Sequence, residues 1–86
     1  MLLTVQQRIL LTLLKYGPLQ NSYIAKSVGI TEQHCSNVIN QLSKEGLIES
    51  EFHAPRRVNR LSPVGRQIAE RILEVEKISA SLIQNE

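Results

Sequence analysis

The stretch TEQHCSNVINQLSKE, residues 31–45, carries the pattern that decides the fold. Four of its apolar residues recur at i, i+3, i+4 and i+7, which places them on one side of a helix: Cys35, Val38, Ile39 and Leu42. The opposite side carries amides and hydroxyls in place of the Glu, Lys and Ala that usually fill a solvated helix surface. Asn and Ser lower helix propensity, so we expect their polar groups to have partners elsewhere. The stretch therefore predicts a helix with one packed side and one side offered for binding.

The offered side suits the major groove of DNA, where Asn and Gln can pair bidentately with adenine. The side chains that we expect to reach base edges are Gln33, Ser36, Asn37 and Asn40. Contacts to the phosphate backbone position such a helix without reading sequence, and we assign them to Ser22, Lys26, Thr31, His34 and Lys44. An ordinary polar helix surface is the alternative at this point.

Composition sets the outer limits of the interpretation. The chain has 86 residues, of which 42% are hydrophobic and 21% charged, and this predicts one globular domain with a core of marginal size. One cysteine excludes an internal disulfide, and no apolar run is long enough to span a membrane. The N-terminal run MLLTVQQRILLTLL has neither a basic leader nor a small-residue cleavage site, so we expect a cytoplasmic protein. The net charge is only +2, but residues 53–66 hold four arginines and no acid, a local footprint for a polyanion.

Glycine, proline and capping signals divide the chain into elements. We expect helices at about 2–16, at 21–28 with Asn21 as N-cap, and from the cap Thr31 to Gly46, then a two-stranded hairpin of 47–52 and 58–61 with an arginine tip. Ser62 followed by Pro63 predicts the start of a last helix to about residue 84. The predicted fold is mainly α with a small β-hairpin: a winged helix-turn-helix in residues 1–62 and a C-terminal helix in residues 63–86 for dimerisation.

Two segments carry a family resemblance. GITEQHCSNVINQLSKEGLIE, residues 29–49, resembles the recognition-helix segment of winged helix-turn-helix transcription regulators of the MarR and ArsR type. RRVNRLSPVGR, residues 56–66, resembles their wing-return motif R-x-Y-x-L-T-x-x-G-R, and the resemblance covers about residues 5–72. The sequence departs from the pattern at Val58, where an aromatic is common, and at Asn37, where a basic residue is common. With a wing in this place, Arg56 and Arg57 are expected to enter an adjacent minor groove, whereas an isolated pair would be read as a solubilising loop tip.

The first and last helices predict a homodimer. The first is apolar nearly all round, and the last carries an apolar seam longer than the small body needs, although its first turns must pack on the first helix of the same chain. The residues that we assign to the dimer interface are Leu3, Leu10, Leu14, Ile72, Val75, Ile78 and Leu82. Two-fold symmetry would place two recognition helices about 34–36 Å apart and predicts an inverted-repeat DNA site.

These features predict a sequence-specific double-stranded DNA-binding protein that regulates transcription, as a repressor rather than an activator. The competing interpretation is a winged-helix protein–protein interaction module of a larger assembly, and RNA binding is less favoured because a helix does not fit the RNA major groove. No enzyme is expected, because the sequence offers no phosphate loop or nucleophile with an evident base. No metal or cofactor is expected either, because Cys35, His34 and His53 cannot supply a closed zinc site. A redox role for Cys35 would require exposure and a basic neighbour.

Overall fold

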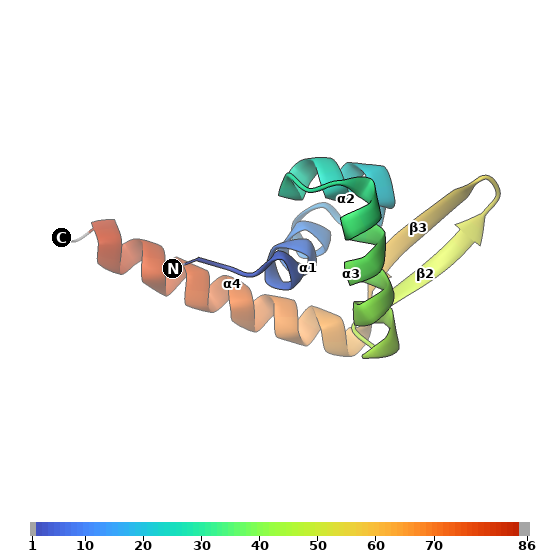
Figure 1. Cartoon of the computed structure of the whole chain (residues 1–86). Coiled ribbons are helices and arrows are strands. Elements are labelled where there is room, and N and C mark those ends of the chain that lie inside the picture. The colour runs from blue at the N-terminus through green and yellow to red at the C-terminus, as the bar shows by residue number, and fades with distance from the viewer. Residues whose placement is uncertain (1, 85–86) are drawn as a thin grey trace.

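The computed structural model describes residues 2–84, without the side chains of residues 83–84, and its elements follow the order α1-β1-α2-α3-β2-β3-α4 (Figure 1). The helices are α1 Val5–Tyr16, α2 Asn21–Val28, α3 Glu32–Lys44 and α4 Pro63–Gln84. The strands are β1 Leu19–Gln20, β2 Ile48–His53 and β3 Arg56–Leu61. This order confirms the predicted winged helix-turn-helix, mainly α with a small sheet.

The first helix begins at Val5, three residues later than the sequence predicted. The hydroxyl of Thr4 accepts a hydrogen bond from the backbone N–H of Gln7 at 3.1 Å, and the Gln7 side chain accepts one from the backbone N–H of Thr4 at 3.0 Å. This reciprocal capping box fixes the start of α1 and leaves Leu2 outside the helix. The apolar run alone did not show this start, because capping depends on polar side chains within it.

The sheet has three strands in the order β1-β3-β2, all antiparallel, where the sequence predicted two. The extra strand β1 has only two residues, too few for alternation to be visible in the sequence. The hairpin strands are also longer than predicted, since His53 pairs with Arg56 and only Ala54 and Pro55 form the turn. Arg56 and Arg57 therefore lie in β3 and not in a loop, which corrects the predicted arginine tip.

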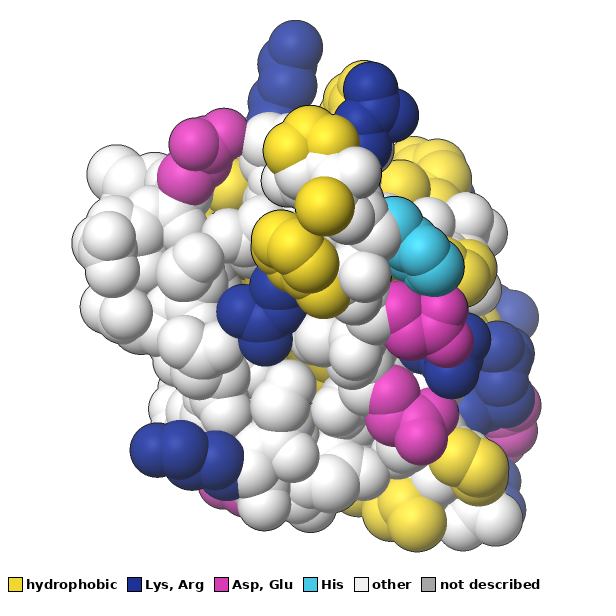
Figure 2. Space-filling view, turned by 90° about the vertical axis from the view of Figure 1, so that its right-hand side faces the viewer, with side chains coloured by type: hydrophobic (Ala, Val, Ile, Leu, Met, Phe, Trp, Pro, Cys, Tyr) yellow, Lys and Arg dark blue, Asp and Glu magenta, His cyan; other side chains and the backbone are white. Residues whose placement is uncertain are grey.

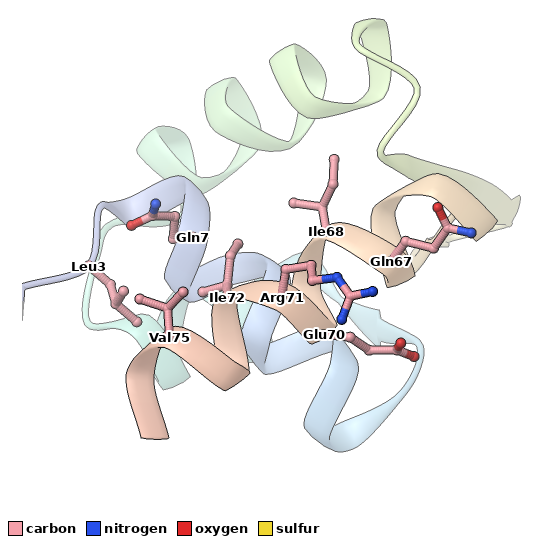
Figure 3. Close-up of a pocket in the computed structure, with 8 residues that line it drawn as sticks. All are labelled: Leu3, Gln7, Gln67, Ile68, Glu70, Arg71, Ile72 and Val75. Carbon is pink, nitrogen blue, oxygen red and sulfur yellow. The ribbon is translucent and has the colours of Figure 1, made fainter. Parts of the chain in front are cut away.

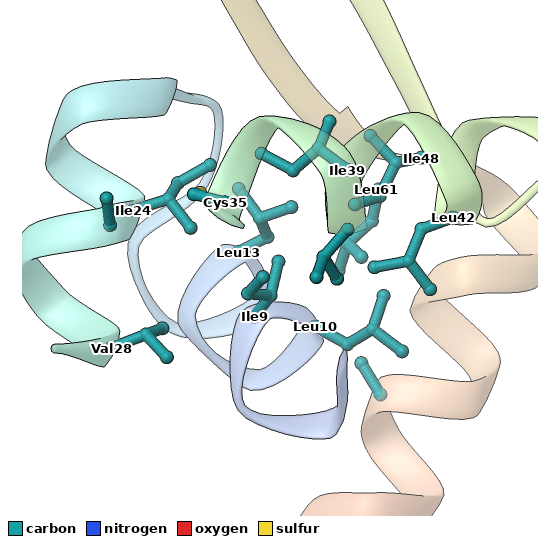
Figure 4. Packing of buried hydrophobic residues seen from close by; sticks show 13 residues of the cluster. Ile9, Leu10, Leu13, Ile24, Val28, Cys35, Ile39, Leu42, Ile48 and Leu61 are labelled. Carbon is teal, nitrogen blue, oxygen red and sulfur yellow. The ribbon is translucent and has the colours of Figure 1, made fainter. Parts of the chain in front are cut away.

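The core lies between α1, α2, α3, the base of the sheet and the first part of α4 (Figure 4). The apolar stripe predicted for α3 is buried, with Cys35 and Ile39 at most 1% exposed. Leu10, which we expected at a dimer interface, is only 3% exposed and packs in this core instead. Its position on α1 gave no sign of which side of that nearly all-apolar helix faces inward.

The start of α4 is tied to the turn that follows α3. As predicted, Ser62 caps α4: its hydroxyl accepts a hydrogen bond from the backbone N–H of Gly65 at 2.9 Å. The same hydroxyl donates to the carbonyl of Gly46 at 2.6 Å, and the backbone N–H of Ser62 donates to Leu47 at 3.0 Å. Gly65 permits this approach, because a Cβ there would lie 1.9 Å from the Leu47 carbonyl oxygen.

Candidate nucleic-acid interface

The exposed side of α3 and the β2–β3 hairpin, hereafter the wing, lie on the same side of the molecule (Figure 1). Viewed from that side, the surface shows a broad area of uncharged side chains with separate lysine or arginine side chains around it (Figure 2). Acidic side chains gather beside a histidine to the right of this area (Figure 2). An acidic side chain also lies at the upper left edge of the area (Figure 2). The uncharged area and the cations at its border are compatible with a polyanionic ligand that is read by hydrogen bonds.

The amides predicted to reach base edges form one exposed row on α3. Gln33, Asn37 and Asn40 are all exposed, and they follow one another at i, i+4 and i+7. The Gln33 side-chain N–H donates to the side-chain oxygen of Asn37 at 3.1 Å, which leaves the Asn37 amide nitrogen free to donate outward. Lys44 is exposed at the end of the same row.

Ser36, the fourth predicted base-reading residue, is half-buried and faces α2. Its hydroxyl accepts a 2.6 Å hydrogen bond from the side-chain nitrogen of Asn21. Asn21 was expected to cap α2, but the N-cap is Gln20 and Asn21 is the first helical residue, with its amide turned toward α3. The structure thus gives Ser36 a contact that links α3 to α2, and this contact uses one of the two acceptor lone pairs of its hydroxyl.

The residues assigned to phosphate contacts lie at the edges of this row. Thr31 caps α3 as predicted, and its hydroxyl accepts from the backbone N–H of His34 at 3.1 Å. Ser22 and Lys26 are both exposed and lie one turn apart on α2. His34 is exposed in the first turn of α3.

The two wing arginines point to opposite sides of the hairpin, because successive residues of a strand alternate between its faces. Arg57 shares a face with Asn59 and Leu61, the side that covers the core, and is half-buried. Arg56 lies on the other face and is exposed, and within the described part of the chain no hydrogen bond or ion pair holds its side chain. The sequence treated the two as one pair, which the alternation of β3 separates.

The outer face of the wing neutralises its own charge. Arg60 forms ion pairs with Glu51 and with Glu49, the latter at 3.7 Å, and His53 lies 3.1 Å from the Glu51 carboxylate. The hydrogen bond from His53, followed by the positive charge of Arg60, lowers the pKa of the Glu51 carboxyl. An ionised Glu51 beside Arg60 makes the part of this face around Arg60 a poor anion-binding surface, and Arg56 remains its unpaired cation among the described residues.

The thiol of Cys35 lies in the core. Burial, followed by the negative charge of Glu32, raises the pKa of the Cys35 thiol, which keeps it protonated. The thiol lies 3.3 Å from the Asn21 side-chain oxygen and 0% of the residue is exposed.

Among residues 2–84, no group of three or more His, Cys, Asp or Glu side chains is placed to hold a metal ion. In the same described part, no helix combines the length and hydropathy needed to cross a bilayer.

A second surface lies on the opposite side of the molecule, where the N-terminal segment runs beside α4 (Figure 1). A groove of about 710 Å³ separates them, with Leu3 on one wall and Ile68, Ile72 and Val75 on the other (Figure 3). The apolar stripe continues along α4 beyond the groove, through Ile78, 62% exposed, and Leu82, 64% exposed. The described chain leaves this stripe uncovered.

Comparison with known proteins places this geometry in a family. The profile of the family described as "Sugar-specific transcriptional regulator TrmB" matches residues 4–64, from the cap of α1 into the first turn of α4. The chain belongs to the TrmB family. This confirms the predicted class of winged helix-turn-helix regulators. No curated protein matches the sequence of this TrmB-family chain.

Solved structures share the fold of this TrmB-family chain. A ZitR variant from Lactococcus lactis superimposes with a TM-score of 0.89 at 19% identity, over 99% of this chain and 60% of that one. A MarR family transcriptional regulator from Silicibacter pomeroyi superimposes with a TM-score of 0.84 at 23% sequence identity, over 94% of this chain and 60% of that one. MepR, a transcription regulator of the Staphylococcus aureus multidrug efflux pump MepA, superimposes with a TM-score of 0.82 at 22% sequence identity, over 96% of this chain and 64% of that one. The chain thus spans about 60–64% of the length of these structures.

The sequence did not show the roles of three polar residues that organise this interface: Asn21, which was expected only as an N-cap, Ser50 and Asn59. Asn21 links α2 to α3, Ser50 and Asn59 form a hydrogen bond within the wing, and Asn59 also bonds to Leu19 of β1. A polar residue within a short strand is the only signal that the sequence offered for Asn59. Its partners lie 9 and 40 residues away along the chain, beyond the reach of any local pattern.

Proposed function

We propose that the chain binds specific double-stranded DNA sequences as a homodimer and represses transcription from the sites that it occupies. The observation that carries the proposal is the exposed row of Gln33, Asn37 and Asn40 on α3, beside a wing whose cationic side chain Arg57 lies on the inner face. In the major groove, side-chain amides can both donate to and accept from one base edge, which a row of lysines cannot do.

The charge distribution supports the same mode of binding. Lys26 and Lys44 border the amide row, and the acids of α3 and its cap region, Glu32 and Glu45, lie at the two ends of the helix. Cations at the border contact phosphates and supply affinity, while the uncharged centre supplies the discrimination between bases. A protein-binding module would have no need to keep the centre of this surface free of carboxylates.

The uncovered stripe on α4 supports a two-fold dimer. Val75, Ile78 and Leu82 are between 44% and 64% exposed, and they follow one another at i, i+3 and i+7. A helix that presents such a stripe beyond its own body is stabilised when a second copy covers it. The 22 residues of α4 extend about 33 Å, so two copies can hold their α3 helices one DNA turn apart on an inverted repeat.

Repression is the mode that these elements can supply by themselves. A dimer that occupies a site overlapping a promoter blocks the polymerase by exclusion, whereas activation requires an additional productive contact. No catalytic step is part of the proposal.

The experiment that tests the proposal is selection of bound sequences from a random duplex pool, followed by titrations at several salt concentrations. We expect an inverted repeat with half-sites about one turn apart, and an affinity that falls steeply with salt. Asn37→Ala is expected to relax the preference at one base pair by about 1–3 kcal/mol, while Lys44→Ala weakens all sequences and reduces the salt slope by about 1. Salt-insensitive binding to a protein, with no duplex selected, would instead support the interaction-module interpretation.

The dimer is tested separately by sedimentation. Ile78→Asp places a carboxylate within the stripe and is expected to produce monomers, whereas Ser81→Asp adds the same charge outside the stripe and is expected to leave dimers. A wild-type chain that sediments as a monomer at micromolar concentration would contradict the homodimer.

A further inference from the structure

A fully buried asparagine lies at the centre of the sheet. Asn59 is 0% exposed, on β3, between β1 and β2. Its side-chain nitrogen donates to the carbonyl of Leu19 on β1 at 3.3 Å, and its side-chain oxygen accepts from the hydroxyl of Ser50 on β2 at 2.7 Å. Asparagine is depleted in strands, and a β-branched apolar residue would fill a buried strand position without needing partners. The presence of an asparagine at this position is therefore better explained by its hydrogen bonds to Leu19 and Ser50.

The hydrogen bonds continue outward from Asn59 to the wing arginine. Ser50 uses its one hydroxyl proton toward Asn59, and its oxygen accepts from the Nη2 group of Arg57 at 3.2 Å. Because Asn59 fixes the direction of the Ser50 hydroxyl, it also fixes where the accepting lone pairs of Ser50 point. The position of the Arg57 guanidinium is thus set by a chain of bonds that ends in the buried sheet.

The register of the hairpin makes this contact diagonal. Ser50 pairs with Asn59, and Arg57 pairs with Phe52, so Arg57 reaches back along the wing toward the neighbouring pair. Phe52 remains 72% exposed on the same face. Only one of the five N–H donors of Arg57 is used by Ser50, so the others remain available to a ligand on the side of the wing that bears Arg57.

We propose that Asn59 and Ser50 are positioning residues that pre-order Arg57 for insertion into the DNA minor groove. The inference rests on the proposed DNA-binding function and adds a specific mechanism to it. A free arginine loses rotamer freedom when it is immobilised on DNA, and an arginine already held by Ser50 has lost part of that freedom before binding. Pre-ordering of one such side chain corresponds to an affinity gain of about twofold to tenfold.

The experiment is a double-mutant cycle on the full chain, with affinity measured for the selected duplex. We expect Ser50→Ala to weaken binding about twofold to tenfold in the wild-type background, and to have little effect when Arg57 is already Ala. Ser50→Thr keeps the hydroxyl on a residue that strands favour, and is expected to restore wild-type affinity. Thermal unfolding of each variant measures any change in the sheet itself.

Arg56→Ala supplies the matched control, because Arg56 lies one residue away on the opposite face of β3. We expect Ser50→Ala and Arg56→Ala to be additive, since Arg57 is the only one of the two arginines that bonds to Ser50. A second readout is the preference for A·T over G·C pairs beneath the wing, where the minor groove is narrow; it is expected to decrease in Ser50→Ala and to return in Ser50→Thr.

The outcomes separate the two proposals. A wild-type chain that binds no duplex overturns the proposed function and the positioning role together. A wild-type chain that binds DNA, with Ser50→Ala neutral or additive with Arg57→Ala, overturns only the positioning role and leaves Asn59 as a structural residue of the sheet. Weaker binding in Ser50→Ala that disappears when Arg57 is already Ala, together with wild-type affinity in Ser50→Thr, supports it.

Discussion

The side-chain nitrogen of Asn21 donates a 2.6 Å hydrogen bond to the hydroxyl of Ser36, so the first residue of α2 holds the first turns of α3. The same side chain accepts from the thiol of Cys35 at 3.3 Å through its oxygen. One amide therefore contacts two consecutive residues of α3, one in the core and one at its border. This fixes the rotation of α3 about its own axis, and with it the direction in which the amide row points.

Removal of this amide is expected to affect both stability and DNA reading. Asn21→Ala should lower the free energy of unfolding by about 1 kcal/mol, because the Ser36 hydroxyl and the Cys35 thiol lose a partner. Base discrimination should decrease as well, since α3 is less firmly oriented. Denaturant unfolding and duplex titrations measure the two effects. Ser27→Ala, which changes an exposed residue of the same helix without an assigned DNA contact, is the control, and an Asn21→Ala chain that behaves like it would contradict the orienting role.

The thiol of Cys35 is expected to be unreactive in the folded protein. Its pKa is raised by burial, so little thiolate is present near neutral pH, and a reagent can reach it only when the core opens. Labelling by a thiol reagent should be slower than for the urea-unfolded chain by on the order of a hundredfold or more. Treatment with peroxide should leave DNA affinity unchanged. Rapid labelling of the folded chain would contradict this prediction and reopen the redox interpretation.

The carboxyl of Glu51 is expected to titrate below its ordinary pKa near 4.5. His53 is the main cause of the lowered pKa, so His53→Ala should move the midpoint back toward the ordinary value, which an NMR titration of the carboxyl carbon can follow. A lowered pKa in the folded state means that the contribution of Glu51 to stability is present above the unfolded-state value. It is lost as the pH falls through the lowered folded-state value. A midpoint at or above the ordinary value would contradict the described contacts.

The close approach at Gly65 predicts that replacing this glycine with alanine, an apolar residue only one methyl group larger, destabilises the fold. A Cβ at this position would lie 1.9 Å from the carbonyl oxygen of Leu47, and backbone atoms on both sides must move to relieve the overlap. Gly65→Ala is therefore expected to cost about 1–3 kcal/mol or more, although alanine is the better helix former. Arg66→Ala changes an exposed neighbour in the same turn and should stay within about 0.5 kcal/mol. Equal unfolding midpoints for the two variants would show that the contact is not constraining.

Local signals in the sequence predicted most of the helical framework. The spacing of Cys35, Val38, Ile39 and Leu42 located the buried side of α3, and the Ser62-Pro63 pair located the start of α4. These signals succeed because a helix face and a helix cap each depend on residues only a few positions apart.

The remaining features depend on contacts between distant parts of the chain. The strand β1 exists because Leu19 and Gln20 pair with Asn59 and Val58, about 40 residues later, and neither residue of β1 shows this by itself. The same holds for Leu10, whose burial is decided by the elements that pack on α1. Alternation along β3 separates Arg56 from Arg57, but only the exact register decides that Arg57 is the one on the inner face, and a shift of one residue would have reversed this.

The Ser62 hydroxyl joins the turn after α3 to the first turn of α4, and Gly65 lets the two segments meet without a gap. Because these contacts join the base of the wing to the long helix, we expect the two to move as one rigid body. If two copies pair through α4, a small change in the angle between the two α4 helices would displace the two wings by a larger distance. This displacement would alter the number of base pairs between the half-sites, while the base preference within each half-site would stay the same. Substitutions that change this angle would therefore alter the preferred spacer length between half-sites before they alter the preferred base sequence.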